Sequence, residues 1–465
     1  MEGAVDSVRI VSRRMVQPSL PTTANVCHQP GDEAEEMHLT PWDLRLITVD
    51  YNQKGILLPK PPSGGGPLVD ALASSFARAM GRFYPFAGRL ATEERNDGTV
   101  TVSLRCTGEG AEFVHAVAPG VAVADIVASL YTPFVVWSFY QFNGVLGADA
   151  AVEPLPLVSV QITELADGVF VGMSMNHSVG DGTTFWDFFN TWSEIHRDGI
   201  CISEDLHELS VPAPVLRRWF VETSPVPIPM PFGKLHHIMR RFERTTVQEC
   251  FFTFSAASVK KLKATTNDEM AGTATATISS LQSVLAHLWR AVCRARCLPP
   301  GQSTCYSIVV GCRGRVNGIP PGYVGNAVVF GKAESTVGEI EEKGLGWTAW
   351  LLNRAVASFD EARMRDSLER WVREPDFTYA GNLSFGGTAL LTGSSPRFDV
   401  FGNDFGWGKP VAVRSGWANK MDGKATVFEG PDKGGSMSLE VCIAPDALAR
   451  LTADEDFMDA VSVPA

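Results

Sequence analysis

The sequence predicts a two-domain α/β protein, built of mixed sheets with flanking helices, and three observations support this fold class. The chain has 465 residues, which is too many for one ordinary hydrophobic core. Strand-like and helix-like spacings of apolar residues alternate along both halves. A proline-rich stretch separates the halves, so we expect a first domain over residues 1–199, a linker over 200–235 and a second domain over 236–465.

The first half contains segments in which apolar residues alternate and segments in which they recur every three or four positions. We expect strands over residues 8–16, 99–104, 157–164 and 168–175. The last of these is almost wholly apolar, which favours a central place in a sheet. Helices are expected over residues 67–83 and 183–197.

Six prolines between residues 209 and 233 exclude a regular helix or an inner strand there. We therefore interpret residues 200–235 as a crossover linker. The second half repeats the mixed pattern, and strands are expected over residues 249–254, 307–312, 325–330, 379–385 and 436–443. Helices are expected over residues 257–265, 280–296 and most of 336–374.

Composition excludes several classes of protein. A formal net charge of −12 and a pI near 5.3 argue against a dominant nucleic-acid surface, which needs a basic face.

Residues 126–148 are uncharged and long enough to raise the question of a membrane span, but Pro133 and Gln141 within them favour a buried strand and turn. Nine scattered cysteines without a CxxC pair, and no apolar signal segment, lead us to expect a reduced, cytoplasmic protein.

One turn stands out as a candidate catalytic segment. His177 and Asp181 lie between a predicted strand and a predicted helix, in the stretch NHSVGDG that ends at Gly182. Such a turn can aim an imidazole into a cleft, and histidine suits general-base chemistry because its ordinary pKa lies near neutral pH. The alternative is a buried turn histidine held by local hydrogen bonds. His28 and Asp32 match the same HxxxD pattern, but no strand precedes them.

A second candidate segment, DFGWGKP, lies 227 residues after His177 and begins at Asp404. Gly406 and Gly408 flank Trp407, so this loop can approach another backbone closely. The alternative is a tight turn that carries a core tryptophan. Adjacent His236 and His237 have no accompanying carboxylate or cysteine ligands, so we expect no metal site.

Together these motifs resemble the BAHD acyltransferases, the plant family of coenzyme A-dependent acyl transfer enzymes. Further matching segments occur in the family's order: YPFAGRL at 84–90, ISS at 278–280 and GYVGN at 322–326. The resemblance implies two chloramphenicol-acetyltransferase-like domains with a channel between them. It also implies that part of residues 402–430 packs with the first domain.

The implied chemistry uses an acyl-CoA thioester as co-substrate, with no metal, no acyl-enzyme and no permanently bound cofactor. His177 acts as the general base for an alcohol or amine acceptor, and the indole N–H of Trp407 is the candidate oxyanion donor. Asp181 is implied to be structural, paired with Arg313 of the other domain. Asp404 is expected to fix its own loop, with Gly182, Gly406 and Gly408 in support.

Coenzyme A carries phosphates that an acidic protein must meet with local donors. Lysines and a helix N-terminus provide candidates, with a solvated lysine face and an ordinary helix cap as the alternative. These candidates are Lys260, Lys261, Lys263, Ser279 and Ser280.

Acceptor selection depends on pocket shape, so two segments are candidate walls: residues 134–143 and 392–397. Phe139, Asn143, Ser394 and Ser395 are the residues proposed from them, with core packing as the alternative. The hydroxycinnamoyl-shikimate/quinate branch has a second histidine before the catalytic one and a Thr-Ser-Trp segment before DFGWG. Here Asn176 and residues 393–395 stand in those places, which disfavours that substrate pair. The segments HLTPWDLRLITVDYNQKGILLPKP and GSSPRFDVFGNDFGWG resemble instead the less characterised branch that includes cuticle-associated acyltransferases, which suggests a lipid or phenolic hydroxyl acceptor.

Two rival functions belong to other classes. One is a non-catalytic or altered-chemistry member of the fold that binds small molecules. The presence of both His177 and Trp407 counts against this alternative. The other is a condensation-type enzyme that takes its acyl group from a carrier protein, against which the DFGWG loop counts. We expect instead a monomer that binds acyl-CoA and a small alcohol or amine.

Overall fold

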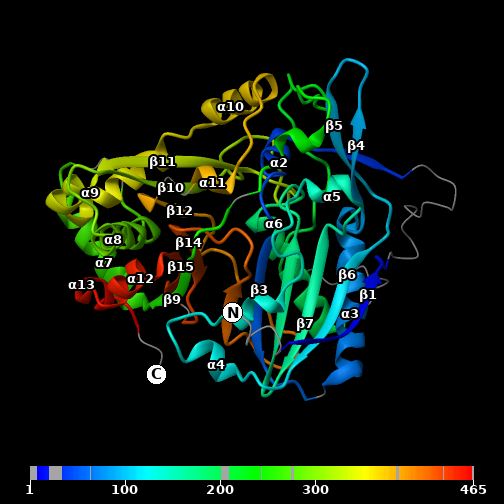
Figure 1. Cartoon of the computed structure of the whole chain (residues 1–465), viewed down its shortest axis with the longest axis horizontal. Helices are drawn as coiled ribbons and strands as arrows, with labels where there is room; N and C mark the ends of the chain where they lie inside the picture. Colours follow the sequence, from blue (N-terminus) through cyan, green and yellow to red (C-terminus); the bar gives the residue numbers. More distant parts are fainter. Residues whose placement is uncertain are drawn as a thin grey trace.

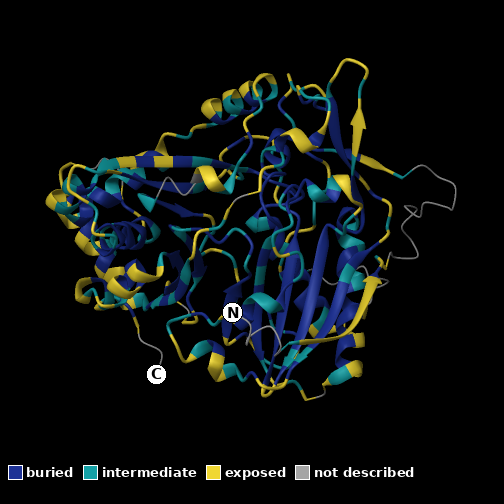
Figure 2. Ribbon diagram, in the orientation of Figure 1, coloured by how far each residue is buried: buried dark blue, intermediate teal, exposed yellow. Residues whose placement is uncertain are grey.

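The computed structural model describes residues 8–19, 34–62, 64–199, 209–241, 243–273, 277–383, 387–432 and 434–462. Its architecture is the mixed α/β fold that the sequence predicts, with two six-stranded sheets and one three-stranded sheet (Figure 1). The central strands of both large sheets are buried, whereas β1 (Arg9–Val16) and much of α10 (Glu361–Arg373) are exposed (Figure 2).

The first large sheet has the strand order β1, β6, β7, β8, β3, β13. Its remaining strands are β6 (Ala111–Ala118), β7 (Val158–Leu165), β8 (Gly168–Met175), β3 (Asn52–Pro59) and β13 (Ala412–Ser415). Every residue of β8 is buried, because β7 and β3 flank it on either side. The central position predicted for residues 168–175 is therefore confirmed.

Strand β13 belongs to the C-terminal half of the chain but completes this first sheet. It pairs antiparallel with β3, with Ala412 opposite Leu57 and Ser415 opposite Lys54. This pairing agrees with the implied packing of part of residues 402–430 against the first domain. The DFGWG segment thus lies on the stretch by which the chain passes from the second large sheet to β13 in the first.

The second large sheet has the order β11, β10, β12, β14, β15, β9. Its strands are β11 (Val328–Thr336), β10 (Ser303–Gly311), β12 (Ala389–Thr392), β14 (Lys424–Glu429), β15 (Met437–Ile443) and β9 (Gln248–Phe254). The helices on this side of the molecule in Figure 1 are α7 (Ala256–Glu269), α8 (Ser280–Ala295), α9 (Val337–Ala357), α12 (Pro445–Thr452) and α13 (Glu455–Met458).

A small sheet joins β2 (Glu36–His38), β5 (Val100–Arg105) and β4 (Arg89–Glu94). The short helices of the first half are α2 (Pro41–Arg45), α4 (Val123–Val127) and α5 (Asp149–Val152). None of the helices in the described part of the chain combines the length and the apolar character that a bilayer crossing requires.

Helix α6 (Gly182–Asp198) begins directly after the candidate catalytic turn, and its aromatic face fixes its position. Phe188 and Trp192 contact Phe76 of α3 (Gly65–Arg82), with ring centroids 5.7 and 5.1 Å apart. All three side chains are fully buried. Burial of one such aromatic ring contributes about 1.5–3 kcal/mol, so this interface holds the N-terminus of α6 firmly in place.

The structure corrects the sequence at three segments. The strand expected over 379–385 is instead the short helix α11 (Ala380–Leu383), and β12 begins only at Ala389; residues 384–386 lie outside the described part. Residues 126–148 contain the end of α4, turns and the 3-10 helix Phe134–Phe139, rather than a strand. Strand β11 begins at Val328 and not at 325, because the backbone of residues 325–327 bonds to side chains of the first half.

The crossover linker is described from residue 209 onwards. Up to residue 234 it contains no helix or sheet strand, only isolated bridges such as Val215 to Tyr323, in accord with its prolines. Residues 200–208 of the expected linker lie outside the described part, and the domain boundaries at 200 and 235 stay predictions.

Candidate active site

The turn that carries His177 is held by the residue before it. The Asn176 side chain donates from Nδ2 to the Gly147 carbonyl at 3.0 Å. Its Oδ1 accepts from the backbone N–H and the hydroxyl of Ser178, at 3.0 and 2.7 Å. Because Asn176 is fully buried, the turn is fixed on both sides of His177. Asn176, which stands where the hydroxycinnamoyl-shikimate/quinate branch has a second histidine, therefore has a structural role.

Asp181 is the N-cap of α6, and other groups occupy both of its oxygens. Oδ1 accepts from the backbone N–H groups of Thr183 and Thr184, each at 3.1 Å. Oδ2 accepts from Arg313 Nη1 at 2.6 Å and from the Ala327 N–H at 3.0 Å. The predicted pairing of Asp181 with Arg313 is present. Asp181 borders the cavity at His177, yet its carboxylate has no oxygen left to orient the imidazole.

Electrostatics agree with this geometry. Burial alone would raise the pKa of Asp181, but the charge and hydrogen bond of Arg313, with the N–H groups of Thr184 and Ala327, hold that pKa below its ordinary value. The same pairing raises the pKa of Arg313 against the opposing effect of burial. Both groups are therefore ionised at neutral pH.

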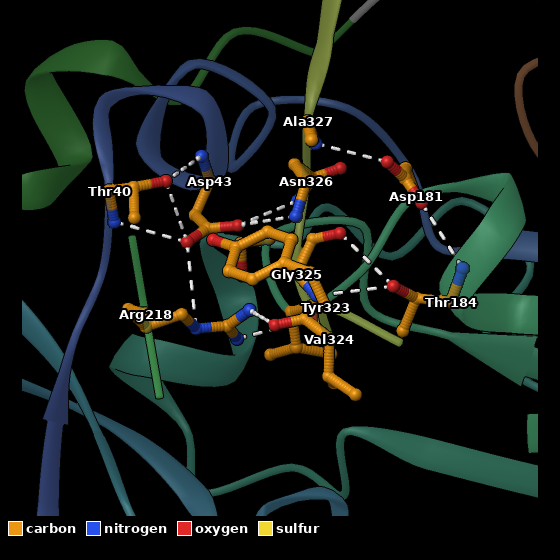
Figure 3. A network of polar contacts seen from close by, with 12 residues as sticks. Thr40, Asp43, Asp181, Thr184, Arg218, Tyr323, Val324, Gly325, Asn326 and Ala327 are labelled. Atoms are coloured by element: carbon orange, nitrogen blue, oxygen red, sulfur yellow. Dashed lines mark hydrogen bonds and ion pairs between the residues drawn. The ribbon is translucent and has the colours of Figure 1, made fainter. Parts of the chain in front are cut away.

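A second contact between the halves was missed from the sequence. Asn326 donates from Nδ2 to the His177 carbonyl at 2.8 Å and to Asp43 Oδ1 at 2.9 Å, and its backbone N–H donates to the same Asp43 oxygen at 3.0 Å (Figure 3). Asp43 is fully buried in α2, where its other oxygen accepts from Thr40. The GYVGN segment thus binds the backbone of the catalytic turn directly.

Arg218 of the crossover linker completes this polar network (Figure 3). Its guanidinium donates to the Val324 carbonyl at 2.5 Å and to the Val179 carbonyl at 3.1 Å, and Nε lies 3.7 Å from Asp43 Oδ2. One side chain therefore connects the linker, the HxxxD turn and the GYVGN segment. Nothing in the local sequence around Arg218 marks this role.

A cavity with about 1060 Å³ of empty space lies at His177 and has walls from both large sheets. The first sheet contributes residues 52–54 and Ser415, while the second contributes Val309, Val328, Phe330, Leu391, Lys424 and Thr426. Trp186 of α6 and Ser394 also line the cavity. The cavity therefore lies between the two large sheets, where the resemblance implies a channel between the two domains.

The His177 ring is positioned to act as a neutral base. Its Nδ1 is buried and has no hydrogen-bond partner among the described residues, which leaves Nε2 as the nitrogen available to the cavity. Burial lowers the pKa of His177 below its ordinary value, and the nearby charge of Lys424 adds to this effect, against the opposite influence of Asp181. The imidazole is thus mainly unprotonated at neutral pH, as a general base must be.

The structure does not support the oxyanion role predicted for Trp407. Its only N–H donor, Nε1, donates to the Pro59 carbonyl at 3.2 Å. The ring packs against His196 and Phe405 and does not line the cavity at His177. In this structure Trp407 is packed as a loop residue, and its role in catalysis stays a prediction.

The rest of the DFGWG loop behaves as expected. Asp404 Oδ1 accepts from the N–H groups of Gly406 and Gly408 at 2.7 and 3.2 Å. Both glycines have positive φ, 98° and 132°, which other residues rarely adopt. Phe405 packs against Trp192 of α6, with ring centroids 4.9 Å apart. The loop fixes the route of the chain from one sheet to the other.

The residues proposed for coenzyme A do not line the cavity at His177, and for three of them the structure shows the features of the alternative role. Ser279 is the N-cap of α8, where its hydroxyl accepts from the Gln282 N–H in a capping box. Lys260 and Lys261 are exposed on α7, and Lys263 is partly exposed. Ser280 is the first residue of α8. Their role in binding coenzyme A stays a prediction.

The acceptor residues divide between the cavity and the core. Ser394 lines the cavity. Phe139 is fully buried against Phe170, with ring centroids 5.0 Å apart, so core packing is its role. Asn143 accepts from Gln53, a cavity residue, at 2.9 Å. Ser395 does not line the cavity, and its hydroxyl accepts from the Arg397 N–H.

Within the described residues no group of three histidine, cysteine, aspartate or glutamate side chains could hold a metal ion. The seven cysteines of the described part are free; Cys293 is buried and Cys297 is exposed. Lys54, Lys420 and Lys424, which the sequence analysis did not single out, all line the cavity. They have no motif of their own, so only the fold brings them together.

The two-sheet fold, the cavity and the HxxxD turn are those of a two-domain acyltransferase. The chain belongs to the Transferase family, which matches residues 6–458, and within it to the BAHD acyltransferases. The protein is an acyl-CoA-dependent acyltransferase.

The comparisons cover nearly the whole chain. An uncharacterised acetyltransferase of Arabidopsis thaliana is 36% identical over 459 residues, which cover 97% of this chain and 99% of the relative. The BAHD acyltransferase DCR of the same plant is 28% identical, with 97% and 92% covered. The resemblance that the motifs indicated is confirmed. The crystal structure of vinorine synthase superimposes with a TM-score of 0.66 at 19% identity, over 98% of this chain and 99% of the other, and this confirms the fold.

Proposed function

We propose that the protein transfers the acyl group directly from acyl-CoA to a hydroxyl or amine of a small acceptor, with His177 as a lone general base. The observation that carries this proposal is the pairing of Asp181. Because Arg313, Ala327 and the first turn of α6 occupy its carboxylate, His177 has no aspartate behind it. The imidazole faces the cavity with a lowered pKa.

In the proposed step, Nε2 of His177 takes the proton of the acceptor while the acceptor oxygen or nitrogen attacks the thioester carbonyl. A C–O or C–N bond forms and the tetrahedral intermediate then breaks its C–S bond. The coenzyme A thiolate leaves and takes the proton from the imidazolium. This sequence restores the neutral base and needs no covalent acyl-enzyme.

Acyl-CoA as the donor has support from outside the chain. A solved relative of the fold, TRI101 of F. sporotrichioides, has been crystallised with coenzyme A and T-2. We assign the same co-substrate to the cavity at His177. We further propose that the protein works as a cytoplasmic monomer and that its acceptor is a small alcohol or amine.

Replacement of His177 tests the base directly. We expect His177→Ala to lower kcat by about 10²–10⁴-fold, the usual contribution of a positioned base, in an assay of thiol release from acyl-CoA. Melting temperature should change little, because the ring Nδ1 has no partner to lose among the described residues. Full activity of a folded His177→Ala protein would end the assignment.

Coenzyme A binding has its own test. A ligand that binds only the native state at 100 times its Kd stabilises that state by about 2.7 kcal/mol. Saturating coenzyme A should therefore raise the Tm of the wild-type protein and of His177→Ala alike. No rise in either protein would favour a carrier-bound acyl donor.

A further inference from the structure

Of the three lysines that line the cavity at His177, one is already neutralised. Lys420 Nζ lies 2.5 Å from Glu249 Oε2 and 2.5 Å from Glu440 Oε1. Trp137 donates to Glu249 at 2.8 Å, and the Ser415 N–H donates to Glu440 at 3.0 Å. This group of one lysine and two glutamates is almost fully buried and internally satisfied. Its role is structural.

The other two lysines have no such partners. Within the described part of the chain, the ammonium group of neither Lys54 nor Lys424 makes a hydrogen bond or an ion pair; Lys54 Nζ lies 5.8 Å from the Phe428 ring centroid. They reach the cavity from different sheets, Lys54 from β3 and Lys424 from β14. A side chain at Gly393 would bring its Cβ to 2.6 Å from Lys424 Nζ, so this glycine leaves room for the ammonium group.

The charges around the two lysines do not balance. When all three lysines and both glutamates are ionised, one positive charge is in excess. Arg414 of β13, which is buried, adds another cation, and its guanidinium donates to the carbonyls of Val413 and Ile126 rather than to a carboxylate. Buried cations without anions are costly, so this cavity lacks a negative charge that a ligand can supply.

The pKa values of the two lysines are consistent with this lack of negative charge in the cavity. Burial, together with the charges of Lys420 and Lys424, lowers the pKa of Lys54 to about 7, although Glu440 and Glu249 act in the opposite direction. Burial and the charge of Lys420 lower the pKa of Lys424 to about 8. Both ammonium groups therefore lose protons readily when the cavity holds no anion, and a bound anion would restore them.

We propose that the cavity binds a substrate that carries a carboxylate, and that Lys54 and Lys424 hold this carboxylate between the two sheets. The inference deepens the proposed acyl transfer and rests on it for the identity of the site. The carboxylate belongs either to the acyl group of the thioester or to the acceptor. Coenzyme A phosphates are excluded as its source, because the pantetheine arm separates them from the reacting carbonyl that His177 serves.

Binding of matched probe pairs tests the inference and distinguishes the two sources. Calorimetric Kd values would be compared for glutaryl-CoA against butyryl-CoA, and for 4-hydroxybenzoate against 4-hydroxybenzamide. We expect about tenfold tighter binding of the carboxylate in one pair, and that pair identifies which substrate carries the charge. Lys54→Met and Lys424→Met should each reduce the preference severalfold. Lys60→Met, an exposed lysine after β3, is the control and should retain it.

The preference for the carboxylate probe should become weaker as the pH rises. The preference should be greatest near pH 6.5, where both lysines are protonated, and should decline as the pH rises through about 7 to about 8. No carboxylate preference in either pair, or a preference that survives the double variant Lys54→Met with Lys424→Met, would overturn the inference.

The same measurements on His177→Ala separate this inference from the proposed function, because binding needs no base. A preserved preference in a protein that shows no acyl transfer in any variant would contradict the proposed function alone. Acyl transfer without a carboxylate preference would contradict this inference alone.

Discussion

Arg313 Nη1 lies 2.6 Å from Asp181 Oδ2, and this ion pair joins the N-cap of helix α6 to the C-terminal half of the chain. The same arginine donates to the carbonyls of Tyr323 and Gly325 at 3.0 and 2.9 Å. Helix capping, domain contact and the position of the catalytic turn therefore depend on one carboxylate. The aspartate of the HxxxD motif serves the base by placing it, without touching its ring.

Asp181→Asn tests that relationship. The asparagine can keep part of the helix cap, but the largely buried Arg313 loses its ion-pair partner and keeps only the more distant charge of Asp187. Removal of one partner from a buried pair costs about 3–5 kcal/mol, so we expect that loss in urea unfolding at pH 7 together with lower activity. The loss should shrink at acid pH, because the lowered pKa of Asp181 makes its stabilisation disappear as pH falls through that value.

Asp187→Asn is the matched control on the same helix. Burial raises the pKa of Asp187 to about 6, so its ionised form opposes folding at pH 7. Because the folded pKa is raised, the penalty grows as pH rises from the unfolded value through about 6. Asp187→Asn should therefore leave stability unchanged or higher at pH 7. Equal destabilisation by both variants would mean that helix contacts, rather than the ion pair, explain the effect.

Asn326→Ala addresses the second contact between the halves. The substitution removes the donors to the His177 carbonyl and to Asp43, and an unsatisfied buried acceptor costs about 1–3 kcal/mol. We expect that loss of stability, and a decrease in kcat larger than any change in KM, because the base is displaced. Asn317→Ala, which removes an exposed hydrogen bond to Glu361, should change neither kinetic parameter. A folded Asn326→Ala protein with normal kcat would show that the turn needs no such support.

The sequence predicts His177 and the loop role of Asp404 because each belongs to a motif with a fixed spacing. The Asp181–Arg313 pair follows only from the family resemblance, because Arg313 lies in none of these motifs. The sequence does not predict Asp43, Arg218 or the cavity lysines. These residues lie far apart in the chain, and only tertiary packing makes them neighbours. Asp43 looks like an ordinary helix-cap residue, and Lys54 like any lysine in a strand.

A similar reason explains the limits of the fold prediction. Segments with clear periodicity, such as those of α6, α8 and β8, are found within a few residues of their predicted bounds. Strands β13 and β12, of four residues each, are too short to show a period, and their places depend on partners such as Leu57 and Cys305. The start of β11 shifts because residues 325–327 bond to Asp43, Asp181 and Thr184 instead of to a strand.

Lys424→Met provides a test of the electrostatic environment of His177. The positive charge of Lys424 lowers the pKa of the imidazole, so its removal should raise that pKa. The acid limb of kcat/KM, measured with an acyl group and an acceptor that carry no carboxylate, should therefore move to higher pH. Lys60→Met should leave the limb in place. A limb that stays fixed or moves to lower pH in Lys424→Met would mean that His177 is not the titrating base.

Trp407→Phe decides between the two roles that the sequence left open for this tryptophan. Loss of an oxyanion donor costs about 10²–10³-fold in kcat. The indole N–H instead donates to Pro59, and the ring packs on His196 and Phe405. A phenylalanine keeps most of this packing and loses one hydrogen bond, so we expect a stability loss of about 1 kcal/mol and a kcat within a few-fold of wild type. A fall of a hundredfold in a protein with nearly normal melting would restore the catalytic role and imply that the loop reorganises when acyl-CoA binds.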